Sequence, residues 1–357
     1  MNEHPRTRRF RSAIALAVLP VLAACSATSE PSSDDATLRA TLSKQDGADV
    51  TVTLTNGTSE PARFLAWNTL ATELGEPLFV LTRDGEPVAY QGRHYKRGLP
   101  RPSDYLVLAP GESLIRAVDL AQYYDMSQPG TYDIQYRAEL APAGARSADE
   151  RAEVTSNHVS VQTAGYVSPL ARRMTLQKSV QSSALAGTPS FAGCSSSQQT
   201  DVTNAFSSAG TYANQAVTYL NGTPSATTRY TTWFGAYSSS NWDVVKGHFA
   251  NIQSAFDSKP FTFDCSTCTS NSFAYVYKDE PYTVYLCGSF WGAPRTGTDS
   301  KAGTIVHETS HFAVVADTDD NAYGQGDCKS LAKSSPSQAR ANADSHEYFA
   351  ENNPALN

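Results

Sequence analysis

The His-Glu-Thr-Ser-His segment at residues 307–311 constrains the fold more than any other feature of this chain. Two histidines spaced in this way face the same side only on an α-helix, where they lie about one turn apart. Small and apolar neighbours such as Ile305 favour a helix, and Ser300 is a suitable N-cap. We therefore predict a helix over about 301–314 that presents both imidazoles on one face.

This pattern is typical of a zinc site. Two neutral imidazoles on one helix face, here those of His307 and His311, can bind one zinc ion. Glu308 would lie beside the metal, where a carboxylate can accept a proton from an activated water. A catalytic zinc also needs a third protein ligand. Spacing alone leaves Asp317 and Asp320, both in the segment that follows, as candidates.

The N-terminus is predicted to be a targeting segment. Several arginines precede an apolar stretch over 12–22, which is too short for a comfortable transmembrane span. The small residues before Cys25 resemble a bacterial lipobox, whose cysteine is acylated, although an ordinary secretory peptide with an incidental cysteine is the alternative. We predict a lipoprotein-type signal peptide over 1–25, a tether over 26–35 and export to the bacterial cell envelope.

Composition narrows the class of the remaining chain. The formal net charge of -7 and the absence of a long basic run argue against a nucleic-acid partner. The hydrophobic fraction of 40% is compatible with sizeable cores, so we do not expect disorder overall. We expect a monomer.

The region over 36–164 has a strand-like pattern. Alternating apolar residues separated by turn signals predict an all-β sandwich of immunoglobulin-like type. We see no catalytic cluster there, and we interpret its histidines, His94 and His158, as incidental. We interpret this region as a propeptide domain, with a permanently attached binding or anchoring module as the alternative.

The rest of the chain consists of a linker and a second domain. Residues 165–189 contain basic residues among Ser, Ala and Gly, which favours proteolysis during activation. Residues 190–357 combine helical spacing with short strands, and this predicts an α+β fold. Besides the helix described above, we predict helices over 201–220, about 242–256 with Ser240 as N-cap, and 337–349.

Four segments of the C-terminal domain resemble a known family. They are Gly-Cys-Ser-Ser-Ser at 193–197, His-Glu-Thr-Ser-His-Phe at 307–312, and the runs over 318–325 and 342–352. Together they are similar to the deuterolysin or aspzincin metallopeptidases, and most closely to the peptidyl-Lys metalloendopeptidases. The resemblance covers residue 191 to the C-terminus. It implies a mostly helical, zincin-like catalytic domain with a small sheet and one zinc ion.

The resemblance also implies residue roles. The family's third zinc ligand is the aspartate of a Gly-Thr-x-Asp-x-x-Tyr-Gly pattern, which matches Asp320, and the tyrosine of the pattern matches Tyr323, a donor to the developing oxyanion. The chain departs from this pattern at Asp317, which replaces the glycine. Asp344 and Glu347 match acidic positions that line the lysine pocket of the Lys-specific relatives.

The matching cysteines imply the disulfides Cys194–Cys265 and Cys268–Cys287, with Cys328 left over. The implied function is a zinc metalloendopeptidase that cuts on the amino side of lysine. We expect it to be made as a zymogen, anchored through its N-terminal lipid before processing and released extracellularly afterwards. The alternatives are a broad-specificity deuterolysin-like endopeptidase and a non-catalytic zinc-binding surface protein.

Overall fold

The computed structural model describes residues 37–140, 152–177 and 187–357, together with Met1. The predicted signal peptide with Cys25 and the tether therefore lie outside the described residues, as do residues 178–186 of the predicted linker. Within the described part, no helix is both long and apolar enough to cross a membrane. Contacts join the described residues from 37 to 357 into one unit.

The N-terminal part is built from β-strands, because β-branched and apolar residues alternate along it. In β2 (Asp49–Asn56), Val50, Val52 and Leu54 are buried while the threonines between them are half-buried. Antiparallel pairs form a sheet in the order β1 (Leu38–Lys44), β2 and β8 (Ser113–Asp119), and a second in the order β10 (Ala152–Thr163), β9 (Gly130–Leu140), β4 (Phe79–Arg83) and β5 (Glu86–Pro87). A separate pair joins β3 (Ala62–Leu65) to β7 (Tyr105–Leu108), and short 3-10 turns lie at η2 (Ala66–Asn68), η3 (Pro102–Asp104) and η4 (Leu120–Gln122).

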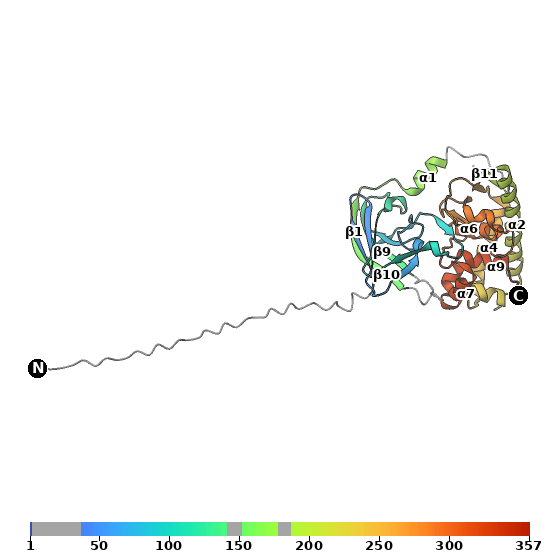
Figure 1. Ribbon diagram of the computed structural model, residues 1–357. Helices are drawn as coiled ribbons and strands as arrows, with labels where there is room; N and C mark the ends of the chain where they lie inside the picture. Colours follow the sequence, from blue (N-terminus) through green and yellow to red (C-terminus); the bar gives the residue numbers. More distant parts are fainter. Residues whose placement is uncertain (2–36, 141–151, 178–186) are drawn as a thin grey trace. The chain divides into compact units, whose positions relative to one another are not determined.

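The C-terminal part is mainly helical. In α2 (Ser196–Leu220), alanines and larger apolar residues recur every three or four positions and are buried, and Ser195 and Gln198 form a capping box at its start. Figure 1 shows α2 beside α4 (Ser239–Ser258), α6 (Lys301–His311) and α9 (Ala343–Glu351), which share one apolar core. The remaining described helices are α1 (Pro169–Gln177), α3 (Thr228–Phe234), α5 (Gly288–Gly292), α7 (Gly324–Ser334) and α8 (Pro336–Arg340).

A five-stranded sheet connects the two parts of the chain. Its order is β11 (Ser190–Ala192), β12 (Thr262–Asp264), β14 (Thr283–Leu286), β13 (Ala274–Val276) and β6 (His94–Lys96). β6 belongs to the N-terminal part, yet it pairs antiparallel with β13, with Tyr95 opposite Tyr275. A segment from the predicted propeptide region therefore forms the edge of a sheet whose other strands belong to the C-terminal part.

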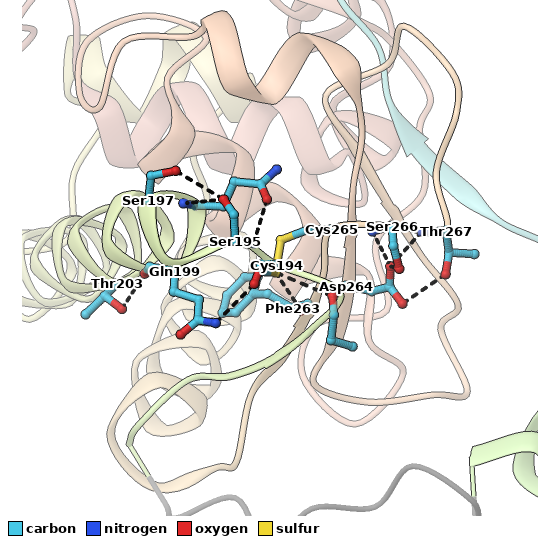
Figure 2. The surroundings of a disulfide bond; sticks show 12 residues. Cys194, Ser195, Ser197, Gln199, Thr203, Phe263, Asp264, Cys265, Ser266 and Thr267 are labelled. Atoms are coloured by element: carbon cyan, nitrogen blue, oxygen red, sulfur yellow. Dashed lines mark hydrogen bonds between the residues drawn. A yellow bond between two sulfur atoms is a disulfide. The ribbon is translucent and has the colours of Figure 1, made fainter.

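Two disulfides link β-strands and helices of this part. Cys194 pairs with Cys265, and Cys268 pairs with Cys287, as the resemblance implies. The first bond joins the start of α2 to the end of β12 (Figure 2). Next to it, the Asp264 carboxylate accepts hydrogen bonds from the Ser266 and Thr267 backbones, at 2.8 and 2.7 Å. The disulfide therefore lies in a locally hydrogen-bonded turn.

The α+β character of the C-terminal region is confirmed, but several predicted helix bounds are wrong. The N-cap of α4 is Ser238, whose Oγ accepts from the Asn241 backbone at 3.1 Å, and not Ser240. α6 ends at His311, earlier than predicted. The helix predicted over 337–349 is divided into α8 and α9, because the backbone around Asn342 pairs with the Asp319 segment.

Candidate active site

The predicted zinc-binding motif lies on α6, deep in the C-terminal core. Ser300 caps this helix, and its Oγ accepts from the Gly303 backbone at 2.9 Å. Every residue of α6 is buried, so His307, Glu308 and His311 have no exposed surface. A helix with buried polar side chains needs partners for them.

Neighbouring groups fix the orientation of both imidazoles. His311 Nδ1 lies 2.8 Å from the Thr318 carbonyl oxygen, to which it can donate a hydrogen bond. His307 Nδ1 lies 2.8 Å from Asp344 Oδ1. Nδ1 of each ring thus lies close to an oxygen atom on one side, and on the other side the two Nε2 atoms lie 3.1 Å apart. This outer support is the arrangement that metal-ligating histidines require.

Asp320 completes a triangle with the two histidines. Its Oδ1 lies 3.2 Å from His307 Nε2, and its Oδ2 lies 3.4 Å from His311 Nε2. The side chain is 3% exposed, yet neither carboxylate oxygen accepts a hydrogen bond from the described residues. By contrast, the Asp317 side chain is 64% exposed and pairs with Lys278 Nζ at 3.0 Å. The structure therefore brings Asp320, and not Asp317, to the histidines.

The geometry of this triangle fits a zinc ion. Nitrogen and carboxylate ligands bound to one tetrahedral zinc at about 2.0–2.2 Å lie about 3.3–3.6 Å from one another. The three separations given above, between 3.1 and 3.4 Å, are close to that spacing. A buried carboxylate with both oxygens unsatisfied would otherwise be costly. His307, His311 and Asp320 are therefore suited to hold a metal.

Glu308 and Tyr323 lie on either side of one peptide bond of β6. The backbone N–H of Lys96 donates to Glu308 Oε1 at 3.3 Å. Tyr323 directly precedes α7, and its hydroxyl donates to the carbonyl oxygen of Tyr95 at 2.9 Å. Burial raises the pKa of Glu308 well above its usual range. The Tyr95–Lys96 peptide bond is thus contacted at its oxygen and at its nitrogen.

The side chain of Lys96 occupies an acidic pocket. Its Nζ lies 2.8 Å from Asp344 Oδ1 and 2.9 Å from Glu347 Oε2, on α9, and all three side chains are fully buried. Asp299 adds a third carboxylate at 3.4 Å. Burial lowers the pKa of Lys96, but Asp344 and Glu347 outweigh this effect and the pKa lies well above its usual range. The pocket therefore stabilises an ammonium group.

Sequence reasoning missed the part of the site that β6 contributes. His94, interpreted as incidental, is buried with its ring centroid 5.2 Å from that of His311. Its ligand atom, with those of His311 and Asp320, forms a group within 4.8 Å that could hold a metal. The available signal was the basic run Arg-His-Tyr-Lys-Arg at 93–97, because an acidic pocket calls for a basic partner. Asp299 was also missed, since it lies far from α9 in sequence.

Two other polar groups near the site serve the fold. His346 Nδ1 lies 2.9 Å from the Asn342 carbonyl oxygen, and its Nε2 lies 3.0 Å from His248 Nδ1. Burial, followed by the neighbouring His248, lowers the pKa of His346 to about 3, so its ring is neutral. Cys328 is a free thiol buried beside Asn342. We find no contact from either residue to the His307–His311–Asp320 triangle within the described chain.

Several known proteins are similar to this chain in sequence. A family profile described as lysine-specific metallo-endopeptidase matches residues 219–351. An extracellular protease of Aeromonas hydrophila is 42% identical over 90% of this chain and 93% of its own length. A peptidyl-Lys metalloendopeptidase of Pleurotus ostreatus is 52% identical over 46% of this chain and 98% of its own. A solved zinc peptidase from Grifola frondosa, 52% identical, matches 46% of this chain and 100% of its own, with a TM-score of 0.44.

Proposed function

Because the chain belongs to the aspzincin family of lysine-specific metallo-endopeptidases, we propose that residues 190–357 hydrolyse peptide bonds on the amino side of lysine. The observation that carries this proposal is the position of Lys96. Its ammonium group is enclosed by Asp344 and Glu347, while the peptide bond before it meets Glu308 and Tyr323. A substrate lysine bound in the same way would have its preceding bond at the catalytic groups.

We propose His307, His311 and Asp320 as the ligands of one zinc ion. The mutual spacing of their ligand atoms and the two unsatisfied oxygens of Asp320 support this set. Zinc held there would supply a Lewis acid that activates water and polarises the substrate carbonyl. Asp344 has a second role in this arrangement, because its contact with His307 Nδ1 keeps Nε2 of that ring directed at the ligand triangle.

The protein groups then have distinct tasks. Glu308 accepts a proton from the attacking water and passes it to the amide nitrogen of the leaving lysine, which the Lys96 nitrogen represents at 3.3 Å. The Tyr323 hydroxyl donates to the carbonyl oxygen as negative charge develops, a contribution of about 2.7–4 kcal/mol for one well-placed donor.

We infer that residues 36–164 form an immunoglobulin-like propeptide domain and that the full chain is a zymogen. β6 supports this, because it adds to β13 at the edge of the sheet as a substrate strand would, and Lys96 fills the acidic pocket. Cleavage within 165–189 would allow the strand to leave. We propose that Cys25 carries a lipid that holds the precursor at the cell envelope, and that processing releases the peptidase.

The two alternatives differ from this proposal in measurable ways. A broad-specificity peptidase would not need a buried pocket with Asp344 and Glu347 placed to hold one ammonium group. A non-catalytic zinc protein would not need Glu308 beside the ligands. A digest of casein by the processed chain, read by mass spectrometry, tests all three. We expect cuts before lysine that a zinc chelator abolishes; cuts without lysine bias, or none, would support one of the alternatives.

Replacing Asp320 by asparagine is expected to remove zinc from the purified protein. The neutral amide offers a weaker ligand, and loss of one of three protein ligands should lower the zinc affinity by at least about a hundredfold. Metal content after dialysis measures this. Asp317→Asn is the matched control, because Asp317 has φ 48°, a conformation that asparagine tolerates, and contacts Lys278 instead. Equal zinc loss in both variants would contradict the assignment.

Replacing Glu347 by glutamine is expected to weaken the preference for lysine by about tenfold or more, because one of the two close carboxylates is neutralised. We choose Glu347 because its Oε2 lies 3.4 Å from His307 Nδ1, whereas Asp344 Oδ1 makes the closer contact with that atom, at 2.8 Å. Rates on matched lysyl and alanyl peptides measure the preference. Glu351→Gln is the control: burial raises the pKa of Glu351 to about 8, so this carboxyl is already largely protonated at pH 7. An unchanged preference in Glu347→Gln would contradict the pocket.

A further inference from the structure

Three tyrosines from adjacent strands lie side by side on one face of the five-stranded sheet. Tyr95 is paired directly with Tyr275, and Tyr275 with Tyr285. Residues directly opposite in antiparallel strands share a face of the sheet. The ring centroids of Tyr95 and Tyr275 are 5.1 Å apart, and Tyr275 and Tyr285 stack at 4.6 Å with an angle of 5° between their planes. The ring of Tyr95 therefore packs on a preformed aromatic pair.

The other face of β6 carries the groups already described. Side chains alternate along a strand, so His94 and Lys96 are directed to the face opposite Tyr95. Lys96 fills the acidic pocket, and the carbonyl oxygen of Tyr95 accepts from Tyr323. Tyr95 thus stands where a substrate would place the residue immediately before the cut bond. The strand therefore indicates which side chains the enzyme accepts immediately before and after the cut bond.

The ring of Tyr95 is largely buried. Its hydroxyl accepts a hydrogen bond from Arg93 at 3.2 Å, and the Arg97 guanidinium lies 4.6 Å from its ring centroid; both arginines flank β6 itself. Tyr95 and Tyr275 are 9% and 2% exposed, and they cluster with Cys287, a member of the Cys268–Cys287 disulfide. A covalent link across this cluster holds the platform in place. Once β6 leaves, the ring of Tyr275 loses its cover on the Tyr95 side, and an incoming aromatic side chain would bury the same surface again.

We propose that Tyr275, stacked on Tyr285 and fixed by the Cys268–Cys287 disulfide, is a specificity subsite for an aromatic residue directly before the lysine. This inference rests on the proposed function, because it takes the Tyr95–Lys96 bond as the position of the cut. The favoured substrates are therefore peptides with Tyr-Lys or Phe-Lys. Acidic or small residues in that place leave the platform uncovered.

A competition experiment tests the subsite. The full-length protein is incubated until its linker is cut, and no fragment is removed. Two peptides that contain a single lysine, preceded by Tyr in one and by Ala in the other, are then added in equal amounts. Mass spectrometry gives the ratio of their kcat/KM values, which does not depend on how much of the enzyme is folded or free of propeptide. We expect Tyr-Lys to be cut about tenfold more efficiently than Ala-Lys.

Two variants then assign that ratio to Tyr275. Tyr275→Ala should bring the ratio to within about twofold of one, while Tyr275→Phe, which keeps the ring, should preserve it. A ratio near one in the unaltered protein, or a preserved ratio in Tyr275→Ala, would overturn the subsite and leave lysine specificity intact. Cutting of neither peptide would instead reject the proposed function, and the subsite with it.

Discussion

Replacing Glu308 by glutamine is expected to lower peptide hydrolysis by at least about a hundredfold while zinc stays bound. Glutamine has nearly the same shape as glutamate, but its amide cannot accept a proton from water. Glu308 Oε1 contacts the Lys96 backbone, which marks the leaving nitrogen, and its Oε2 accepts no hydrogen bond from the described residues. The rate on a lysyl peptide and the zinc content of the same preparation measure the two effects.

The zinc content decides between two roles for Glu308. With His307 and His311 it forms a group whose ligand atoms lie within 4.8 Å of one another, so it could also bind a metal directly. A ligand role predicts that Glu308→Gln loses zinc together with activity. Glu351→Gln is a suitable control, because Glu351 is buried and bonds to Ser300 at the start of the same helix without contacting the ligand triangle. Residual wild-type turnover in Glu308→Gln would contradict both roles.

The parts of the fold that depend on nearby residues could be predicted from the sequence. α6 is an example: Ser300 is its N-cap, and His307 and His311 share a face as their spacing requires. α2 follows the apolar spacing in the same way. Short-range hydrogen bonds and one-turn contacts decide these features, and both are visible in the order of residues.

Features that depend on distant residues could not be predicted in this way. α8 and α9 are separate because Asp319 bonds to the backbone of Ala341 and Ala343, and nothing in the segment over 337–349 indicates this contact. The same bridge positions Asp320 beside the histidines, while Asp317 turns toward Lys278. Spacing alone could not decide which of these two aspartates is the third ligand, because the difference between them lies in tertiary contacts.

β6 is the clearest case of such a limit. The segment over 94–96 is short, lies among other strands and contains no motif, so its alternation gives no sign of which sheet it joins. Its partner β13 lies far along the chain. The interpretation of His94 as incidental came from considering the N-terminal region by itself. A basic segment gains meaning only when the acidic pocket of α9 is known to be near it.

The ion contacts of Lys96 give the propeptide proposal its energetic basis. A buried charge that loses its partner costs about 3–5 kcal/mol, since the remaining charge cannot be solvated. Lys96, Asp344 and Glu347 are all fully buried, so removing the lysine would leave the two carboxylates without their ammonium partner. Water or another cation would then be favoured in the pocket over β6. The strand should therefore be displaced far more readily.

Replacing Lys96 by alanine in the full chain is expected to open the cleft to substrate. We would make the change in the Glu308→Gln background, which cannot cut itself, and titrate a fluorescent lysyl peptide. A cost of about 3–5 kcal/mol corresponds to about 10²- to 4 × 10³-fold tighter apparent binding than in the parent. Lys44→Ala, on an exposed position of β1, is the control and should behave as the parent. Peptide binding as weak in Lys96→Ala as in the parent would show that other contacts of the propeptide, and not this ammonium group, close the site.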